Sequence, residues 1–314
     1  MTNAGTGSGE FPPRHAPLPV KDIGRLLVRC ADRPGLVAAV TGLLAETGAN
    51  IISLDQHSTQ QTGGIFMQRT IFHLPGLAAA RADLEREFLA RVAEPFSIDF
   101  RLTEAAKPTR VDAHELGRAL TQPKRVAVMA SIEDHCLLDL LWRNRRGELD
   151  MSIAMVVANH PDLADQVRPF GVPFIHVPAG RGIREEAEQR QLELLRGNVD
   201  LVVLARYMQI LTPRFLAEVG CPLINIHHSF LPAFIGAAPY RRAKERGVKL
   251  IGATAHYVTE DLDEGPIIEQ DVVRVDHRHS VEDLARLGAD VERAVLSRAV
   301  QWHCEDRVIR YGNQ

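Results

Sequence analysis

Two different periods of apolar and polar positions follow one another in the first third of the chain. Strand-like runs lie at 25–31, 49–59, 65–74 and 97–103. Helical spacing of apolar residues recurs at 36–48 and 77–96. The turn Thr62-Gly63-Gly64 joins its two flanking runs as a hairpin. The predicted order β-α-β-β-α-β is typical of a ferredoxin-like fold.

From residue 124 onward, short apolar strands alternate with amphipathic helices. Strands are expected at 125–130, 151–157, 173–177, 200–204, 222–226, 249–257 and 267–275. Helices are expected at 135–146, 162–168, 184–196, 213–218 and about 280–303. This alternation predicts an α/β domain with a doubly wound, mainly parallel, Rossmann-like sheet. Because ligands bind at the carboxyl ends of such strands, the loops after 125–130, 200–204 and 222–226 are expected to form the site.

The chain is thereby divided into four segments. Residues 1–22 are rich in Gly, Pro, Thr and Ser and are interpreted as a flexible tail. A first domain is expected at 23–103 and a second at 124–314, and the segment 104–123, which contains prolines and has weak periodicity, is expected to link them.

Composition excludes several classes of function. The 314 residues carry a net charge of -3, so neither a nucleic-acid surface nor a membrane surface is expected. The 4 cysteines form no C-x-x-C pair, which indicates neither a zinc site nor a disulfide framework. The lack of a disulfide framework, of a signal peptide and of a long apolar run favours a location of the protein in the cytoplasm.

The densest polar cluster after an expected strand is Asn225-Ile226-His227-His228-Ser229. Asn225 and His227 are two positions apart, so on an extended segment both point to the same side. An amide and an imidazolium can donate hydrogen bonds to one oxygen, which would stabilise an oxyanion. Two other interpretations remain open: His227 and His228 could be core histidines bonded to backbone, or zinc ligands.

A second cluster is acidic and follows the strand expected at 249–257. Asp261 and Asp263 lie in the segment TEDLDEGP at 259–266. On its own this pattern favours a solvated turn. A carboxylate brought next to His227 would instead hold the imidazole protonated and orient a water molecule.

Three motifs carry a family resemblance. The segments NIHHSFLPAFIGA at 225–237, HYVTEDLDEGPII at 256–268 and LARYMQILTP at 204–213 resemble the formyltransferase family that uses 10-formyltetrahydrofolate, over about 124–311. The loop DRPG at 32–35 and GANI at 48–51 resemble an ACT domain. The pairing resembles the family of formyltetrahydrofolate deformylases.

This resemblance implies the roles of particular residues. The catalytic Asn, His and Asp of the family fall on Asn225, His227 and Asp263, with Asp261 as a nearby rival for the last. The implied folate-binding residues are Met208, Gln209, Ile210, Leu211, Val258, Thr259 and Asp261. The implied reaction is hydrolysis of 10-formyltetrahydrofolate to formate, which balances one-carbon pools and supplies purine synthesis. Neither a metal nor a cofactor is implied, since the folate is the substrate.

The N-terminal resemblance implies regulation and assembly. ACT domains pair through their sheets, so a homo-oligomer, a dimer or tetramer, is expected. Asp32, Arg33 and Gly35 lead into a helix N-terminus that suits the carboxylate of a small amino-acid effector. Asn50, expected beside them, would contact the amino group. The alternative is that the loop is simply a turn between strand and helix.

The turn at 131–136 distinguishes this chain from other enzymes of the formyltransferase family. Glycinamide ribonucleotide transformylases need a glycine-rich turn there for phosphate. Here the turn has no glycine and carries Glu133 and Asp134, each of which would repel a phosphate by about 1 kcal/mol or more. A Met-tRNA formyltransferase would need a C-terminal tRNA-binding module and a basic patch. Water is therefore the expected acceptor, and a folate-binding sensor with poor catalysis stays as the alternative of another class.

Two departures from the family pattern are visible. Ala238 stands where a longer polar residue is expected, and Arg241 and Arg242 stand where His and Gln are expected. The chain also ends where relatives continue with a few apolar residues, so a terminal strand is expected to be shortened.

Overall fold

The computed structural model describes residues 18–19, 22–104, 110–111, 123–180, 182–232, 239–310 and 312–313. The chain divides into two compact units, residues 1–122 and 123–314. Most of the expected tail and linker, together with Ala238, lies outside the described residues. One pairing that the sequence does not predict joins β1 (Leu18–Pro19) to β6 (Arg110–Val111) in an antiparallel ladder.

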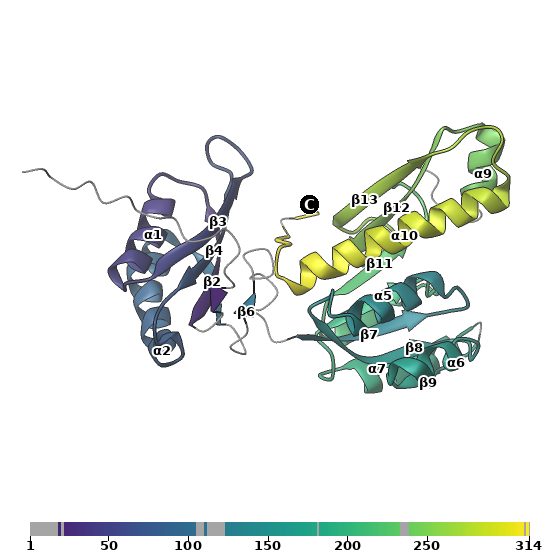
Figure 1. The fold of residues 1–314 in the computed structure, drawn as a ribbon, viewed down its shortest axis with the longest axis horizontal. Coiled ribbons are helices and arrows are strands. Elements are labelled where there is room, and N and C mark those ends of the chain that lie inside the picture. Colours follow the sequence, from purple (N-terminus) through teal and green to yellow (C-terminus); the bar gives the residue numbers. More distant parts are fainter. Residues whose placement is uncertain are drawn as a thin grey trace, which may run out of the picture. The chain divides into compact units, whose positions relative to one another are not determined.

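The first unit is an antiparallel sheet covered on one face by helices (Figure 1). Its strands, in the spatial order β3-β4-β2-β5, are β2 (Ile23–Ala31), β3 (Asn50–Ser58), β4 (Ile65–His73) and β5 (Asp99–Glu104). The helices are α1 (Leu36–Glu46), α2 (Leu77–Phe88), a π-helical turn (Leu89–Ala93) and α3 (Glu94–Phe96). The predicted order β-α-β-β-α-β is confirmed.

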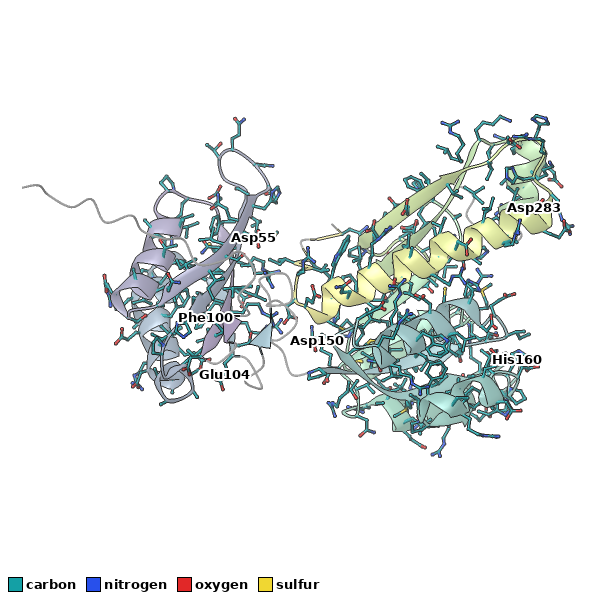
Figure 2. The ribbon with its side chains drawn as sticks, in the orientation of Figure 1. Asp55, Phe100, Glu104, Asp150, His160 and Asp283 are labelled. Carbon is teal, nitrogen blue, oxygen red and sulfur yellow. The ribbon has the colours of Figure 1, made fainter. Side chains whose placement is uncertain are left out.

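Apolar residues of both helices pack against this sheet. Phe88 of α2 and Phe100 of β5, which is labelled in Figure 2, place their ring centroids 4.7 Å apart. Gly48 has a φ of 81°, which a glycine adopts without steric cost, and it ends α1 so that the chain can return as β3.

The second unit contains a seven-stranded sheet in the order β13-β12-β11-β10-β7-β8-β9. Its strands are β7 (Lys124–Ala130), β8 (Met151–Ala158), β9 (Phe174–His176), β10 (Leu201–Ala205), β11 (Leu223–His227), β12 (Leu250–Tyr257) and β13 (Ile267–Arg274). The five neighbouring strands β11, β10, β7, β8 and β9 are parallel to one another, whereas β12 and β13 are antiparallel to their neighbours. The expected mainly parallel sheet is confirmed.

Helices cover both faces of this sheet, which explains why its central strands are apolar at nearly every position. Along β7, Val126 and Val128 face one core while Ala127 and Met129 face the other. The first core is closed by α5 (His135–Arg145), α6 (Ala164–Val167) and α10 (Val281–Cys304). The second is closed by α7 (Arg184–Leu195) and α8 (Pro213–Glu218). A short 3-10 turn (Arg168–Phe170) follows α6.

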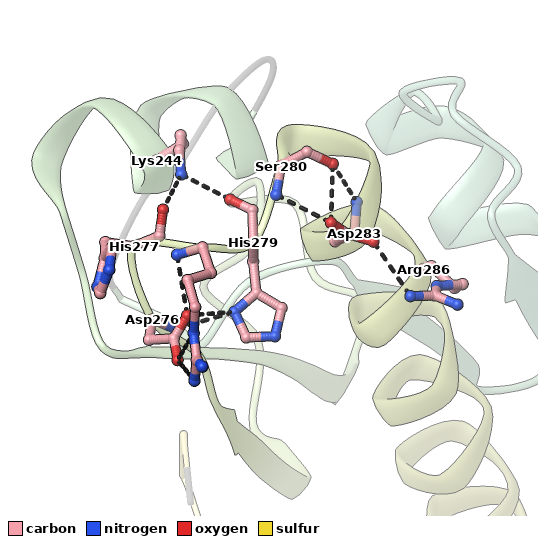
Figure 3. Close-up of polar contacts among 8 residues, drawn as sticks. Lys244, Asp276, His277, His279, Ser280, Asp283 and Arg286 are labelled. Atoms are coloured by element: carbon pink, nitrogen blue, oxygen red, sulfur yellow. Dashed lines mark hydrogen bonds and ion pairs between the residues drawn. The ribbon is translucent and has the colours of Figure 1, made fainter.

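Helix α10 begins at a capping box and is tied there to α9 (Pro239–Arg246). The Ser280 side chain accepts from the Asp283 backbone, and the Asp283 carboxylate accepts from the Ser280 backbone (Figure 3). Lys244 of α9 donates to the carbonyl oxygens of His277 and His279, at 2.8 and 2.6 Å. These bonds fix the start of a helix that carries a buried glutamate toward the cavity described below.

Among the helices that the structure describes, none combines the length and the apolar character needed to cross a bilayer.

Candidate active site

A cavity of about 410 Å³ opens where β10, β11 and the loop after β12 meet. It is lined by residues 204 and 206–211, by residues 225–228, and by residues 256 and 258–263. The loops that follow β10 and β11 therefore lie at the site, as predicted from the parallel sheet. The third wall follows an antiparallel strand, which the rule for parallel sheets does not predict. The turn after β7 does not line this cavity.

His227 and Asp263 form the buried floor of the cavity. His227 Nδ1 lies 3.3 Å from Asp263 Oδ1, and the two side chains are 8% and 12% exposed. The hydrogen bond from His227 holds the pKa of Asp263 below its usual value, so this carboxyl is ionised at neutral pH. His227 Nε2 is buried and has no hydrogen-bond partner in the described part of the chain. This geometry does not fit a core histidine bonded to backbone.

Asn225 lies beside this pair and is held by His256, a residue whose role the sequence did not predict. Asn225 Nδ2 lies 3.2 Å from His256 Nε2, because the two residues are directly opposite in the antiparallel ladder of β11 and β12. His256 Nδ1 lies 2.9 Å from the carbonyl oxygen of Tyr257, so Nδ1 carries the proton and Nε2 accepts from the amide. Burial lowers the pKa of His256, which keeps the ring neutral.

The mouth of the cavity is apolar and exposed. Met208, Ile210 and Leu262 are 59%, 57% and 59% exposed there. The backbone N–H of Val258 donates to the carbonyl oxygen of Leu223. Thr259 Oγ1 donates to the carbonyl oxygen of Asp261 at 3.1 Å. This arrangement suits a flat aromatic ligand that enters over the apolar rim toward the polar floor.

Asp263, rather than Asp261, is the carboxylate that meets the histidine. Asp261 lines the cavity, and its backbone carbonyl oxygen accepts from Thr259 Oγ1. The geometry thus brings together Asn225, His227 and Asp263, the three residues that the family resemblance implies, and adds His256 to them.

Three residues that line the cavity hold a left-handed backbone conformation. The φ angles of Arg206, Met208 and Asp263 are 61°, 59° and 59°. For residues with a side chain this conformation costs about 1–2 kcal/mol, so packing around the cavity must maintain it. Such local strain is typical of sites where side chains are held in fixed positions.

A buried polar network lies behind the histidines, and the sequence did not predict it. Glu292 of α10 is 2% exposed and accepts from Tyr240 of α9 at 2.7 Å. The same carboxylate contacts His135 Nε2 at 2.8 Å and Arg206 Nε at 3.5 Å. Sequence spacing gives no signal of this network, because its members lie on α5, α9, α10 and the loop after β10.

His228 connects this network to the floor of the cavity. Its ring stacks on His227, with centroids 5.3 Å apart, and lies 6.3 Å from Tyr240. Burial, and then the nearby Arg206 guanidinium, lower the pKa of His228 to about 4. His228 is therefore neutral at physiological pH.

Comparisons with known proteins agree with this geometry. Residues 124–300 match the formyl transferase family, and residues 24–88 match the ACT domain. The formyltetrahydrofolate deformylase of Mycobacterium tuberculosis is 73% identical over 293 residues, which cover 93% of this chain and 90% of that protein. The one from Bacillus subtilis is 50% identical, with 94% and 93% covered. The chain belongs to the formyltetrahydrofolate deformylase family.

A solved deformylase structure supports the same assignment for the whole chain. The crystal structure of a formyltetrahydrofolate deformylase from Pseudomonas syringae pv. tomato superposes with a TM-score of 0.81 and 46% identity. The match covers 93% of this chain and 92% of that one, so it includes both the ACT domain and the formyltransferase domain.

Among the described residues, one group of side chains has the spacing of metal ligands. His135, Cys136 and Glu292 bring one ligand atom each within 4.8 Å. Burial, and then the charge of Glu292, raise the pKa of the Cys136 thiol, which keeps it protonated. A neutral thiol with a guanidinium next to the carboxylate disfavours a divalent cation. The alternative that His227 and His228 are zinc ligands gains no support, because among the described residues no group of three ligand atoms within 4.8 Å of one another includes this pair.

The loop expected to bind an effector in the ACT domain is held by internal contacts. The Asp32 carboxylate accepts from the Ser58 hydroxyl. The Arg33 guanidinium lies 4.6 Å from the centroid of the Phe96 ring. Gly35 has a φ of 94° and precedes α1, so its backbone conformation explains why a glycine stands there.

Asn50 does not lie beside this loop, and the expectation that it would is wrong. In the sheet, Asn50 pairs with His73, which pairs with Ile23 at the start of β2, whereas the loop follows Ala31 at the end of β2. β2 has nine residues and spans about 30 Å. Since α1 carries the chain back along this length, β3 begins at the opposite end of the sheet from the loop.

Proposed function

We propose that this protein hydrolyses 10-formyltetrahydrofolate to formate and tetrahydrofolate. The observation that carries the proposal is the position of His227. Its Nδ1 is held by the ionised Asp263, while its buried Nε2, beside the Asn225 amide, has no partner among the described residues. The names of the relatives and the apolar mouth of the cavity agree with a folate as the substrate.

The chemistry follows from these positions. Water attacks the formyl carbon, with Asp263 orienting it and His227 relaying protons. His227 Nε2 and the second Asn225 N–H donate to the oxyanion that develops on the former formyl oxygen. Collapse of this intermediate breaks the bond from carbon to N10, and N10 takes a proton. The steps use only side chains and water.

Two features support water, rather than an amine, as the acceptor. The turn at 131–136 has no glycine and presents Glu133, which is exposed, instead of a phosphate cradle. Next to it, Glu292, His135 and Tyr240 form a buried network that fills the space behind the histidine pair. A transferase that accepts a phosphorylated amine is therefore the weaker reading, and a sensor without catalysis is disfavoured by the assembled floor of the cavity.

We further propose that residues 208–211 and Val258, Thr259 and Asp261 bind the folate, since all of them line the cavity. A small amino acid is the proposed effector of the ACT domain, with Asp32, Arg33 and Gly35 as its loop. The proposed homo-oligomer, a dimer or tetramer, would form through the ACT sheets, in which β3 and β5 are the edge strands. The products would balance one-carbon pools and supply formate for purine synthesis.

The decisive experiment uses purified protein and 10-formyltetrahydrofolate with no amine present. We expect stoichiometric release of formate and tetrahydrofolate. Release only after glycinamide ribonucleotide is added would instead establish a transferase, and binding without release would establish a sensor.

A further inference from the structure

Arg206 is a largely buried charged residue at the carboxyl end of a central strand. It directly follows β10, holds a φ of 61°, and lines the cavity with a side chain that is 13% exposed. Its Nε lies 3.5 Å from a carboxylate oxygen of Glu292, which is 2% exposed. The positive charge is therefore held in place by a buried counter-charge rather than by solvent.

The guanidinium of Arg206 has an N–H donor that makes no hydrogen bond. Arg206 Nη1 is buried and has no hydrogen-bond partner within the described residues, and the same is true of His227 Nε2. Both residues line the same cavity, at the ends of the neighbouring parallel strands β10 and β11. A buried donor without a partner costs about 1–3 kcal/mol, so two such donors on residues that line one cavity indicate a ligand with two acceptor oxygens.

The surrounding charges restrict which anion can fit. Glu292 is already compensated by Arg206, His135 and Tyr240. Asp263 is ionised, since its pKa is lowered by the hydrogen bond from His227. A phosphate dianion between these two carboxylates would be repelled, whereas a small planar monoanion can accept from the two donors without approaching either carboxylate.

We propose that Arg206 and His227 form a subsite for a small monocarboxylate, and that its ligand is the formate released by the reaction. This inference rests on the proposed function for the identity of the ligand. The carboxylates of the folate tail are less suitable, because the mouth of the cavity is apolar and the two donor atoms are buried.

The subsite gives Arg206 a part in the reaction. One water oxygen bonds to the formyl carbon, the bond from carbon to N10 breaks, and N10 takes one of the two water protons. The other proton is released to solvent, and the two oxygens on carbon become those of formate. As this anion forms, His227 Nε2 donates to one oxygen and Arg206 Nη1 to the other, which stabilises the charge where it develops.

The test is direct binding of ¹³C-formate to the full-length protein, measured by NMR line broadening, with product inhibition by formate as a second measurement. Arg206→Gln removes the charge. Arg206→Lys keeps the charge but carries all its donors on one nitrogen, so it cannot contact Glu292 and formate through separate nitrogens as the planar guanidinium can. Arg214→Gln is the matched control, because Arg214 is an exposed arginine paired to Glu218 on α8.

We expect Arg206→Gln to weaken formate binding by about ten- to one-hundredfold, as for loss of a hydrogen bond to a charged group, and to raise the inhibition constant equally. The KM for the folate should change less than about twofold. Arg214→Gln should bind formate as the wild type does. If Arg206→Gln does not fold, formate binding by Arg206→Lys tests the subsite instead, and we expect that binding to be about three- to tenfold weaker than in the wild type.

Equal binding of formate by the wild type and the Arg206 variants would overturn the subsite, and so would lack of binding by the wild type. The binding measurement needs no turnover. A protein that binds formate through Arg206 but releases none from 10-formyltetrahydrofolate would therefore refute the proposed function and leave the subsite standing.

Discussion

His227 Nδ1 faces Asp263 Oδ1 at 3.3 Å, although one residue ends β11 and the other lies in the loop that follows β12. From this contact we expect replacement of Asp263 and replacement of Asp261 to have different effects. Asp263→Asn should lower kcat by about 100-fold or more, because the uncharged amide accepts more weakly from His227 and cannot take a proton from water. Asp261→Asn should lower it less than about tenfold. Steady-state formate release measures both, and equal losses would contradict the assignment of Asp263.

The same contact predicts a dependence of stability on pH. Contact with His227 lowers the pKa of Asp263 below the value of 3.8 that applies to the unfolded chain. Its contribution to the free energy of unfolding is therefore complete above pH 3.8 and is lost as the pH falls toward the lower folded value. Urea unfolding at a series of acidic pH values should show a shallower loss for Asp263→Asn than for the wild type.

If the pH dependence of the two proteins were parallel below pH 3.8, the lowered pKa of Asp263 would be wrong.

His256 is expected to act through Asn225 and not on the substrate. Replacing it with leucine removes the acceptor that orients the amide, so kcat should fall about tenfold while the KM for the folate stays within about twofold. His160, labelled in Figure 2, follows β8, two strands away from β10, and does not line the cavity, so His160→Leu is the control and should retain activity. A large rise in KM for His256→Leu would indicate a direct role in binding.

Gly288 of α10 permits the close approach of Tyr240. A Cβ atom at Gly288 would lie 1.9 Å from the Tyr240 hydroxyl, so Gly288→Ala must displace that ring and break its bond to Glu292. We expect a loss of about 1–3 kcal/mol in the free energy of unfolding, measured by urea denaturation.

Gly42, in α1, has no atom within 4 Å of the added Cβ and is the matched control. Gly42→Ala should be neutral or stabilising by up to about 1 kcal/mol, because alanine has the higher helix propensity. A stable Gly288→Ala variant would mean that Tyr240 can move without cost.

The sequence predicted the fold of the second unit closely for a physical reason. Its central strands are covered on both faces, so they form apolar runs that amphipathic helices interrupt, and both patterns are local. Asn225 and His227 could be found because they lie two positions apart on one strand. Asp263 was preferred over Asp261 only through family resemblance, and its distance from His227 supplies the independent reason.

The features of the site that the sequence did not predict depend on contacts between segments that are far apart in the chain. The role of His256 follows from the register that sets it opposite Asn225. The contact of Arg206 with Glu292 joins a loop to a helix far along the chain, and no spacing rule connects them. The expectation for Asn50 was wrong because the place where β3 begins depends on the direction in which α1 returns the chain, which no local pattern shows.

The antiparallel pairing of β11 with β12 has a consequence for how activity arises during refolding. Side chains on a strand alternate between faces, so a slip of one residue would set Ala255 or Tyr257 opposite Asn225 and turn His256 to the other face of the sheet. A refolding chain could then regain its helices and its apolar core while remaining inactive. Recovery of formate release would therefore report on strand register, at a stage that helical circular dichroism does not detect.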